Sequence, residues 1–199
     1  YGYNRYQLEI WVRKHFKDAI IIRLPALFGN NLKKNFIYDF INIIPTMLKK
    51  DKFTELLLLD KEIEKYYKLQ DNGFYKVLEL SRDEKEILKE KFKTFEFSAL
   101  NFTDSRNMYQ FYPLDRLWKD INICIENNIK LWHAATEPIV IEELYKYLTG
   151  KDFKNEVLET TIKYDYKTVN DDLFGGKNGY ICNKEKILVA IKKFVEKFK

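Results

Sequence analysis

The sequence predicts an α/β fold in which helices cover a parallel sheet, and two features near its beginning support this. Residues 1–17 carry apolar side chains at the spacing of an amphipathic helix, namely Tyr3, Tyr6, Ile10 and Trp11. Residues 19–22, Ala-Ile-Ile-Ile, are wholly apolar, too short for a second helix and rich in β-branched side chains. A strand that is apolar on both faces indicates a parallel sheet between helices.

A Pro/Gly-marked segment, Arg-Leu-Pro-Ala-Leu-Phe-Gly at residues 23–29, follows this strand and is expected to form a loop. In parallel sheets, ligands bind beyond the carboxyl ends of the strands. The sequence therefore directs attention to this loop as part of a ligand site.

Residues 1–29 also resemble the catalytic segment of the NAD-dependent epimerase/dehydratase family, the extended short-chain dehydrogenases. In that family a Tyr-x-x-x-Lys helix leads to a strand, and here Tyr1 and Arg5 take the two motif positions. Residues four apart share a helix face, so both side chains can point at one ligand. The resemblance implies that Tyr1 is the acid/base hydroxyl and that Arg5 holds the nicotinamide ribose of NAD or NADP.

Arg5 departs from the family pattern, because a guanidinium is wider than an ammonium and does not give up its proton. It can supply a positive field but not a proton relay of the lysine kind. A second departure is Ala26, which stands where many epimerases carry an Asn that contacts substrate. The reductase branch of the family also lacks this Asn.

The resemblance implies two further groups of site residues. Pro25, Ala26 and Leu27 are expected to lie near the cofactor, in the loop after the strand. A polar group at the start of the next helix is expected to contact a nucleotide-linked sugar: Lys33, Lys34 and Asn35. The alternative for these three residues is an ordinary helix start.

A Gly-rich turn of the form G-x-x-G-x-x-G, which places a helix N-terminus against a pyrophosphate, does not occur in the sequence. The resemblance therefore implies the C-terminal portion of a longer protein, inactive when isolated. The expected fold is the C-terminal part of a doubly wound, Rossmann-like parallel sheet plus a small mixed α+β substrate-covering domain. Residues 1–50 and 108–135 are assigned to the nucleotide-binding domain, and residues 51–107 and 136–199 to the smaller one.

Local signals predict the later elements. Asp71-Asn72-Gly73 predicts a turn, and Ser81 with Glu84 has the form of a capping box that opens a helix. The other expected elements are a helix over 61–68, an extended segment over 108–114, a helix capped by Asp115, a strand over 129–134, a helix over 141–148 stopped by Gly150, and a last amphipathic helix over 187–198.

Composition excludes several classes of protein. The 199 residues are 46% hydrophobic and 33% charged, as in a globular protein, and no apolar run has the roughly 20 residues of a membrane helix. The net charge is +5, but only six of the 35 basic residues are Arg and the Lys alternate with acids, which favours a solvated surface over nucleic-acid binding.

Cysteine and histidine positions give no metal-binding pattern. Cys124 and Cys182 are far apart, which suggests structural thiols in a reducing, cytoplasmic compartment. His15 lies near a helix end, where an imidazole can bond an unpaired carbonyl, and His133 is isolated in sequence.

Two functions remain open at this stage. The first is an NAD(P)-dependent epimerase, dehydratase or reductase acting on a nucleotide-linked sugar. The second, prompted by Arg5 and Ala26, is a non-catalytic binding or assembly protein that keeps the fold. Unpaired edges on the strands at 20–22 and near Leu131 would be covered by a second copy of the chain in a homodimer.

Overall fold

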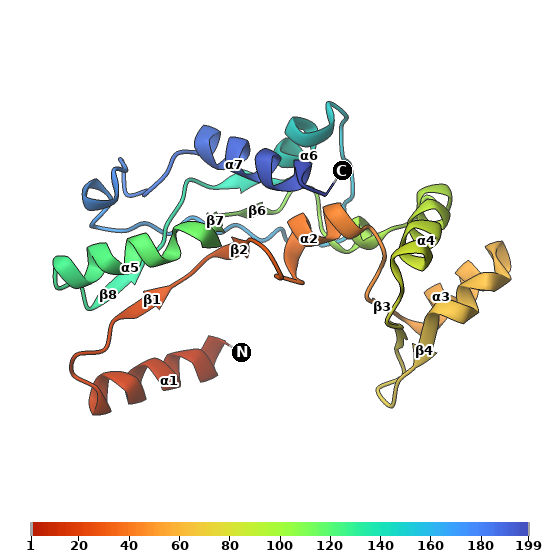
Figure 1. Ribbon diagram of the computed structural model, residues 1–199, viewed down its shortest axis with the longest axis horizontal. Helices are drawn as coiled ribbons and strands as arrows, with labels where there is room; N and C mark the ends of the chain where they lie inside the picture. The colour runs from red at the N-terminus through yellow and green to blue at the C-terminus, as the bar shows by residue number, and fades with distance from the viewer. Residues whose placement is uncertain (1, 199) are drawn as a thin grey trace. The chain divides into compact units, whose positions relative to one another are not determined.

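The computed structural model describes residues 2–198, and the chain forms two compact units (Figure 1). Unit 1 comprises Tyr1–Leu32, Ser105–Lys154 and Glu159–Lys199, and unit 2 comprises Lys33–Asp104 and Asn155–Leu158. The fold is mixed α/β, with about 47% of residues in helices and with small parallel and antiparallel sheets.

Unit 1 combines short strands with longer helices. Its elements in chain order are α1 (Gly2–His15), β1 (Ile21–Arg23), β2 (Ala26–Phe28), β6 (Met108–Tyr109), β7 (Phe111–Pro113), the 3-10 turn η3 (Leu114–Arg116), α5 (Leu117–Glu126), β8 (Leu131–His133), β9 (Ile139–Val140), α6 (Ile141–Thr149), the 3-10 turn η4 (Asp172–Phe174) and α7 (Lys184–Glu196).

The apolar strand after α1 pairs as expected. β1 runs parallel to β8, and the register places Ile21 opposite Leu131 and Arg23 opposite His133. The sequence-based prediction of a parallel strand over the Ile-rich segment is therefore confirmed. Parallel pairing brings the carboxyl ends of both strands to the same edge.

The expected loop over residues 23–29 is largely a second strand, so this prediction is wrong. Ala26–Phe28 forms β2, which pairs in parallel with β7, and Ala26 N–H donates to the Gln110 carbonyl at 3.1 Å. Pro25 separates the two strands because it has no N–H to continue the ladder. The turn is therefore reduced to Leu24 and Pro25.

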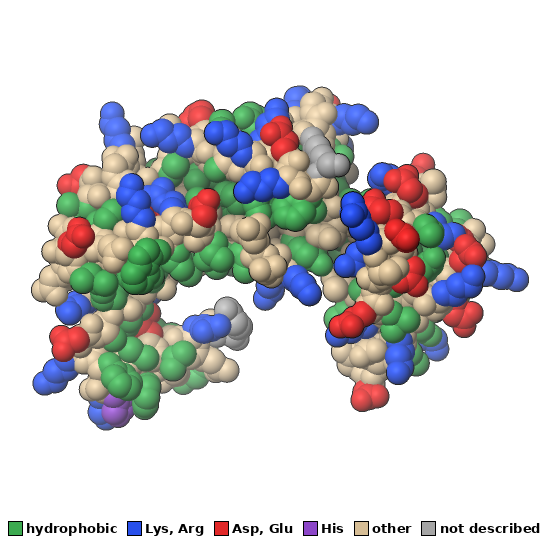
Figure 2. Space-filling model, viewed as in Figure 1, with side chains coloured by type: hydrophobic (Ala, Val, Ile, Leu, Met, Phe, Trp, Pro, Cys, Tyr) green, Lys and Arg blue, Asp and Glu red, His purple; other side chains and the backbone are tan. Residues whose placement is uncertain are grey.

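Helix α1 forms where predicted, but its apolar face is not covered by the described residues. None of Gly2–His15 is buried, with Tyr3 73% and Trp11 49% exposed. Figure 2 shows apolar side chains at the surface over α1, at the lower left. The sequence pattern is enough to specify a helix, whereas burial also requires a surface to pack against.

One buried cluster of unit 1 surrounds Trp132 of β8. Trp132 stacks on Phe174, with ring centroids 4.4 Å apart, and Tyr112 meets Trp132 edge-on at 6.2 Å. Cys124, Ala134 and Ile181 complete this buried cluster. Strand β8 thereby anchors the loop that precedes α7.

The helix predicted from Asp115 begins later, and Asp115 is not its cap. The chain passes through η3 before α5 starts at Leu117, and the N-cap position is Arg116, which makes no capping bond. Arg116 instead reaches along the helix to Asp120, with Nε and Oδ2 2.7 Å apart. A buried ion pair within the first turns of α5 thus takes the place of the cap that the sequence suggested.

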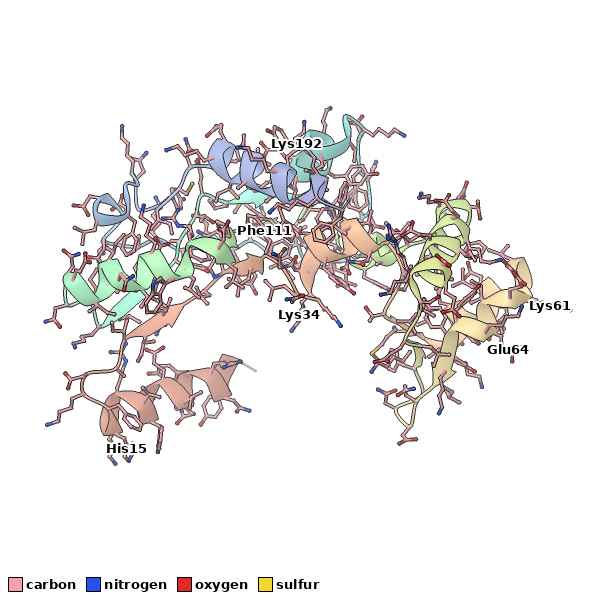
Figure 3. All side chains as sticks on the ribbon, in the orientation of Figure 1. His15, Lys34, Lys61, Glu64, Phe111 and Lys192 are labelled. Atoms are coloured by element: carbon pink, nitrogen blue, oxygen red, sulfur yellow. The ribbon has the colours of Figure 1, made fainter. Side chains whose placement is uncertain are left out.

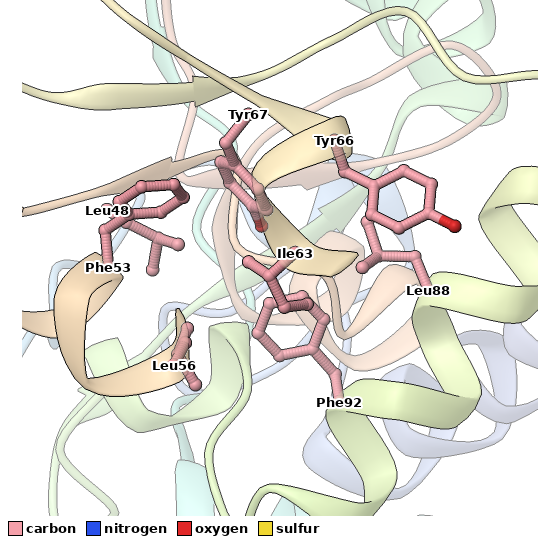
Figure 4. Packing of buried hydrophobic residues seen from close by; sticks show 8 residues of the cluster. All are labelled: Leu48, Phe53, Leu56, Ile63, Tyr66, Tyr67, Leu88 and Phe92. Carbon is pink, nitrogen blue, oxygen red and sulfur yellow. The ribbon is translucent and has the colours of Figure 1, made fainter. Parts of the chain in front are cut away.

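Unit 2 has its own core (Figure 4). Its elements are α2 (Asn35–Asn42), β3 (Met47–Leu48), α3 (Lys50–Leu59), the 3-10 turn η1 (Lys61–Tyr66), β4 (Tyr67–Leu69), β5 (Tyr75–Val77), α4 (Arg82–Thr94) and the 3-10 turn η2 (Ala99–Phe102). The buried cluster consists of Leu48, Phe53, Leu56, Ile63, Tyr66, Tyr67, Leu88 and Phe92.

Local predictions in unit 2 are mostly confirmed. Ser81 and Glu84 form both bonds of a capping box at the start of α4. The turn before β5 has Gly73 at φ 79°. The helix expected over 61–68 is wrong, because a short 3-10 turn leads directly into β4, where Tyr67 is buried and its hydroxyl donates to the Pro45 carbonyl at 2.7 Å.

The end of α6 and the start of α7 lie close to the positions that the sequence predicts. Helix α6 stops at Gly150, which adopts a left-handed φ of 74°. Helix α7 starts earlier than expected, at Lys184, and buries one apolar stripe: Ile187, Leu188, Ile191 and Val195.

The two units follow different boundaries from the expected domains. Residues 136–154 and 159–198 group with unit 1 rather than with residues 51–107. A buried amide explains part of this grouping, since Gln110 Nε2 donates to the Tyr166 carbonyl at 2.8 Å and Tyr166 N–H donates to Gln110 Oε1 at 3.1 Å. The assignment of cofactor and substrate roles to separate domains stays a prediction.

No helix within residues 2–198 is both long and apolar enough to cross a membrane.

Candidate functional site

A charged cluster lies at the carboxyl ends of β1 and β8, which is where a parallel sheet offers its ligand site. We call Glu9, Arg13, Arg23 and His133 the Arg23 cluster. Arg23 is the last residue of β1 and His133 the last of β8, while Glu9 and Arg13 come from α1. Parallel pairing places Arg23 beside His133, and the bonds from Arg23 to Glu9 bring α1 to the same edge.

Arg23 is the central residue of this cluster. Its Nε and Nη2 donate to the two carboxylate oxygens of Glu9 at 3.0 and 2.8 Å, and its Nη1 lies 3.1 Å from Nε2 of His133. This two-bond fork matches the planar geometry of a guanidinium to that of a carboxylate. The Arg23 side chain is nevertheless 45% exposed, whereas the Glu9 side chain is 13% exposed.

Arg13 shares the same carboxylate from within α1. Its Nη2 donates to Glu9 Oε1 at 2.8 Å, one helical turn away. Two guanidiniums therefore flank one carboxylate, which leaves the cluster with a net positive charge when His133 is neutral. Such a charge favours an anionic ligand at this edge of the sheet.

Neighbouring groups and burial shift the pKa values of Glu9 and His133. Burial raises the pKa of Glu9, but hydrogen bonds from Arg23 and Arg13 lower it by more, so it lies below the ordinary 4.5. Burial lowers the pKa of His133 below the ordinary 6.5, and the nearby charge of Arg23 lowers it further. At neutral pH the cluster therefore contains an ionised Glu9 and a neutral imidazole.

The residues expected to bind the cofactor occupy varied places in unit 1. Tyr1 lies outside the described residues. Arg5 is exposed on α1, one turn before Glu9 and on the same helix face. Pro25 forms the bend after β1, while Ala26 and Leu27 are half-buried strand residues of β2. Arg5 thus lies one helical turn before Glu9, and Pro25 lies two residues after Arg23.

The residues expected to bind substrate belong to unit 2. Lys33 and Lys34 are exposed just before α2, and the Lys34 side chain projects away from the helix in Figure 3. Asn35 adopts a left-handed φ of 74°, and its Oδ1 accepts the Ile37 N–H at 3.0 Å. Asn35 therefore stabilises the start of α2, as the ordinary helix-start alternative requires.

Sequence reasoning does not identify the four members of the cluster as site residues. A signal is present, because each of two apolar strands ends in a polar residue, Arg23 after the Ile run and His133 after Trp132. His133 looks isolated in sequence because its partner is 110 positions away in the chain. His15, by contrast, behaves as expected, with its Nδ1 2.8 Å from the Trp11 carbonyl oxygen near the end of α1.

A hollow of about 580 Å³ lies beside the glycine loop that precedes α7. Asn178 and Gly179 have positive φ angles of 60° and 85° and make a tight two-residue turn between Lys177 and Tyr180. Glu137 Oε2 already accepts the Lys184 N–H at 2.8 Å at the start of α7. This carboxylate occupies the helix terminus that would otherwise attract an anion.

The cysteine thiols and the acidic side chains are the candidates for a nucleophile and for a metal site. Cys182 lines the hollow, but burial raises its pKa, which disfavours the reactive thiolate. Within residues 2–198 there is no group of three or more His, Cys, Asp or Glu side chains that could hold a metal ion.

Comparisons with models of protein families, with curated protein sequences and with solved structures gave no match to this chain.

Proposed function

We propose that this chain is the C-terminal part of an NAD(P)-dependent epimerase, dehydratase or reductase acting on a nucleotide-linked sugar. The observation that supports it best is the parallel β1–β8 pair, which ends in Arg23 and His133 directly beside α1. A doubly wound sheet binds a dinucleotide at the carboxyl ends of its strands, and we propose the same for this pair. The resemblance of residues 1–29 to the catalytic segment of short-chain dehydrogenases supports the same conclusion.

The charge of the site is compatible with a dinucleotide. Two guanidiniums and one carboxylate leave positive charge beside the strand ends, where the phosphates of an anionic cofactor would be stabilised. When bound, NAD or NADP would accept or donate a hydride. In this proposal Tyr1 moves a proton at its phenol oxygen and Arg5 supplies a positive field that favours the phenolate.

Lys33, Lys34 and Asn35 are proposed to contact the nucleotide-linked sugar. The two lysines are exposed, so their ammonium groups are available to phosphate oxygens. Asn35 Oδ1 accepts the Ile37 N–H, and we propose that this side chain also lies beside the substrate. We further propose a cytoplasmic protein, since Cys124 and Cys182 are both unpaired thiols.

The test is a titration of the full-length gene product with NADH and NADPH, read by fluorescence of the reduced nicotinamide. We expect saturable binding of one of them. Tyr1→Phe should retain binding and lose turnover of a nucleotide-linked sugar, because it removes only the proton-transferring oxygen. Arg5→Lys should retain both.

The outcomes separate the two functions. A well-folded full-length protein that binds neither nucleotide would overturn the proposed enzyme and favour a non-catalytic binding or assembly role. Light scattering on the same samples measures whether two copies associate.

A further inference from the structure

Helix α1 depends on polar contacts for its attachment to the sheet. It contributes no buried residue from Gly2 to His15, and it meets β1 through the forked bond between Glu9 and Arg23. A helix of this length is only marginally stable in water without tertiary contacts. A change that weakens the bonds between Glu9 and Arg23 should therefore also increase the local unfolding of α1.

His133 holds Arg23 from the opposite side. With Nη1 of Arg23 at 3.1 Å, the imidazole must present the lone pair of Nε2, so it is neutral with its proton on Nδ1. A hydrogen bond with the backbone of Lys167 also fixes the ring. Arg23 is thereby held between a carboxylate and an imidazole, and each of its terminal nitrogens has a partner.

Protonation of His133 would reverse this contact. Both ring nitrogens then carry protons, so Nε2 can no longer accept, and a cation faces the guanidinium of Arg23. The only acid of the cluster cannot compensate, because Glu9 is already shared by Arg13 and Arg23. Repulsion between two cations at hydrogen-bond distance would move the Arg23 guanidinium away from the His133 ring.

Among the described residues, Glu9 is the acid whose charge acts on His133, and Glu9 is already shared by two guanidiniums. The Tyr166 ring lies edge-on to the imidazole, 6.0 Å between centroids, and burial raises its pKa so that it stays neutral. The ammonium of Lys167 lies over the Tyr180 ring at 5.1 Å, and Asp165 accepts from the Tyr180 hydroxyl at 2.6 Å. Arg5, on the Glu9 face of α1, adds a further positive charge.

We propose that Glu9, Arg23 and His133 form a pH-sensitive latch, which holds α1 against the carboxyl ends of β1 and β8 at neutral pH and releases it in acid. The latch itself stands on this geometry alone. Its consequence for catalysis rests on the proposed function, because α1 carries Arg5 and release would remove that residue from the cofactor.

Hydrogen exchange of the α1 amides tests the latch without using the reaction. After correction for the intrinsic exchange rate, we expect protection of these amides to fall roughly fivefold from about pH 7.5 to about pH 5.5. His133→Gln should abolish this response, because a glutamine oxygen can accept from Arg23 but does not titrate in this range. Amides of α7 serve as the internal reference for the folded unit.

The second histidine provides a matched control. His15 lies in the last turn of α1, at the end marked in Figure 3. Its Nδ1 lies 2.8 Å from the Trp11 carbonyl oxygen of the same helix, so this polar contact is made within α1 and not with Arg23. His15→Gln should therefore keep the acid-induced loss of protection. Loss of the response in His15→Gln, or its persistence in His133→Gln, would overturn the latch.

A variant on α1 keeps the test decisive if His133→Gln does not fold. Glu9→Gln removes the charge from the centre of the cluster at a position outside the core. It should lower α1 protection roughly fivefold already at about pH 7.5, with α7 unaffected. Unchanged α1 protection in this variant would contradict the proposal. Hydrogen exchange of the α1 amides does not depend on nicotinamide binding. The experiment can therefore contradict the latch without contradicting the proposed function, and the reverse.

Discussion

The Tyr112 hydroxyl donates a hydrogen bond of 2.7 Å to the carboxylate of Asp120, and both residues are fully buried. Arg116 completes the group with bonds of 2.7 and 3.1 Å to the two Asp120 oxygens. A buried carboxylate is tolerated only when it is paired and hydrogen-bonded. The group therefore joins β7 to α5 through a fully satisfied polar core.

Removal of this carboxylate should strongly destabilise the protein. In Asp120→Ala the Arg116 charge and the Tyr112 hydroxyl lose their partner inside unit 1, so we expect a loss of about 3–5 kcal/mol in the free energy of unfolding. Urea denaturation measures it. Asp115→Ala, at an exposed acid one turn earlier, should change stability by less than about 0.5 kcal/mol. Equal effects of the two variants would contradict this role for Asp120.

Asp39 on α2 should reduce stability at neutral pH. Burial raises its pKa from 3.8 to about 6, so the folded state favours the protonated form and stability is lost as pH rises through this window. Asp39→Asn should raise the free energy of unfolding by about 1–2 kcal/mol above pH 7, after allowance for solvent screening. It should have little effect below about pH 4.

The control for Asp39 is Asp71→Asn, at an exposed turn position. It should leave the pH dependence of the urea midpoint as in the wild type. A wild-type pH profile in Asp39→Asn would show that this carboxyl does not titrate as its burial implies.

Lys91 should give unit 2 an acid-sensitive contribution to stability. Its ammonium bonds Asp60 at 2.5 Å and Glu62 at 2.9 Å. The hydrogen bond from Lys91 is the largest cause of the lowered pKa of Asp60 and of the pKa of Glu62 near 2. Since both folded pKa values lie below the unfolded ones, this stability is present above about pH 4.5 and is lost as pH falls.

Lys91→Met should therefore flatten the acid limb of the pH–stability curve. The measurement is the urea midpoint between about pH 5 and pH 2. Lys85→Met, on the exposed part of the same helix, should leave the slope unchanged. An unaltered slope in Lys91→Met would assign the acid sensitivity to other carboxylates.

Alanine substitutions at Gly175 and Gly176 should separate the cost of a left-handed backbone from the cost of a steric overlap. A Cβ on Gly176 would lie 2.0 Å from the Tyr180 carbonyl oxygen, whereas a Cβ on Gly175, at φ 72°, would meet nothing within 4 Å. Gly175→Ala should cost about 1 kcal/mol, the price of a left-handed alanine. Gly176→Ala should cost more, because the backbone at Tyr180 must move. Thermal unfolding of both variants checks the order, and a smaller loss for Gly176→Ala would contradict it.

Features that depend on neighbouring residues could be predicted from the sequence. The Ser81–Glu84 capping box and the Gly150 helix stop each involve residues within about one turn, so their geometry follows from local chemistry. The parallel direction of β1 was also predictable, because an apolar segment with no polar face needs cover on both sides.

The Arg23 cluster could not be predicted in this way. Its members come from α1, β1 and β8, and Arg23 meets His133 only because the register sets Ile21 opposite Leu131. A shift of one residue would turn these side chains to the opposite face of the sheet. The same dependence on distant pairing explains why Ala26–Phe28 became a strand, since β7 supplies the partner for its backbone.

The sequence by itself determined helix α1, the capped start of α4 and the stop of α6 at Gly150, because hydrophobic spacing and capping residues act over a few positions. Only the tertiary structure decided which polar side chains meet at the strand ends, and which apolar face, that of α1, stays at the surface of the described chain. Those outcomes depend on the relative placement of segments far apart in sequence, and residue spacing along the chain carries no information about that placement.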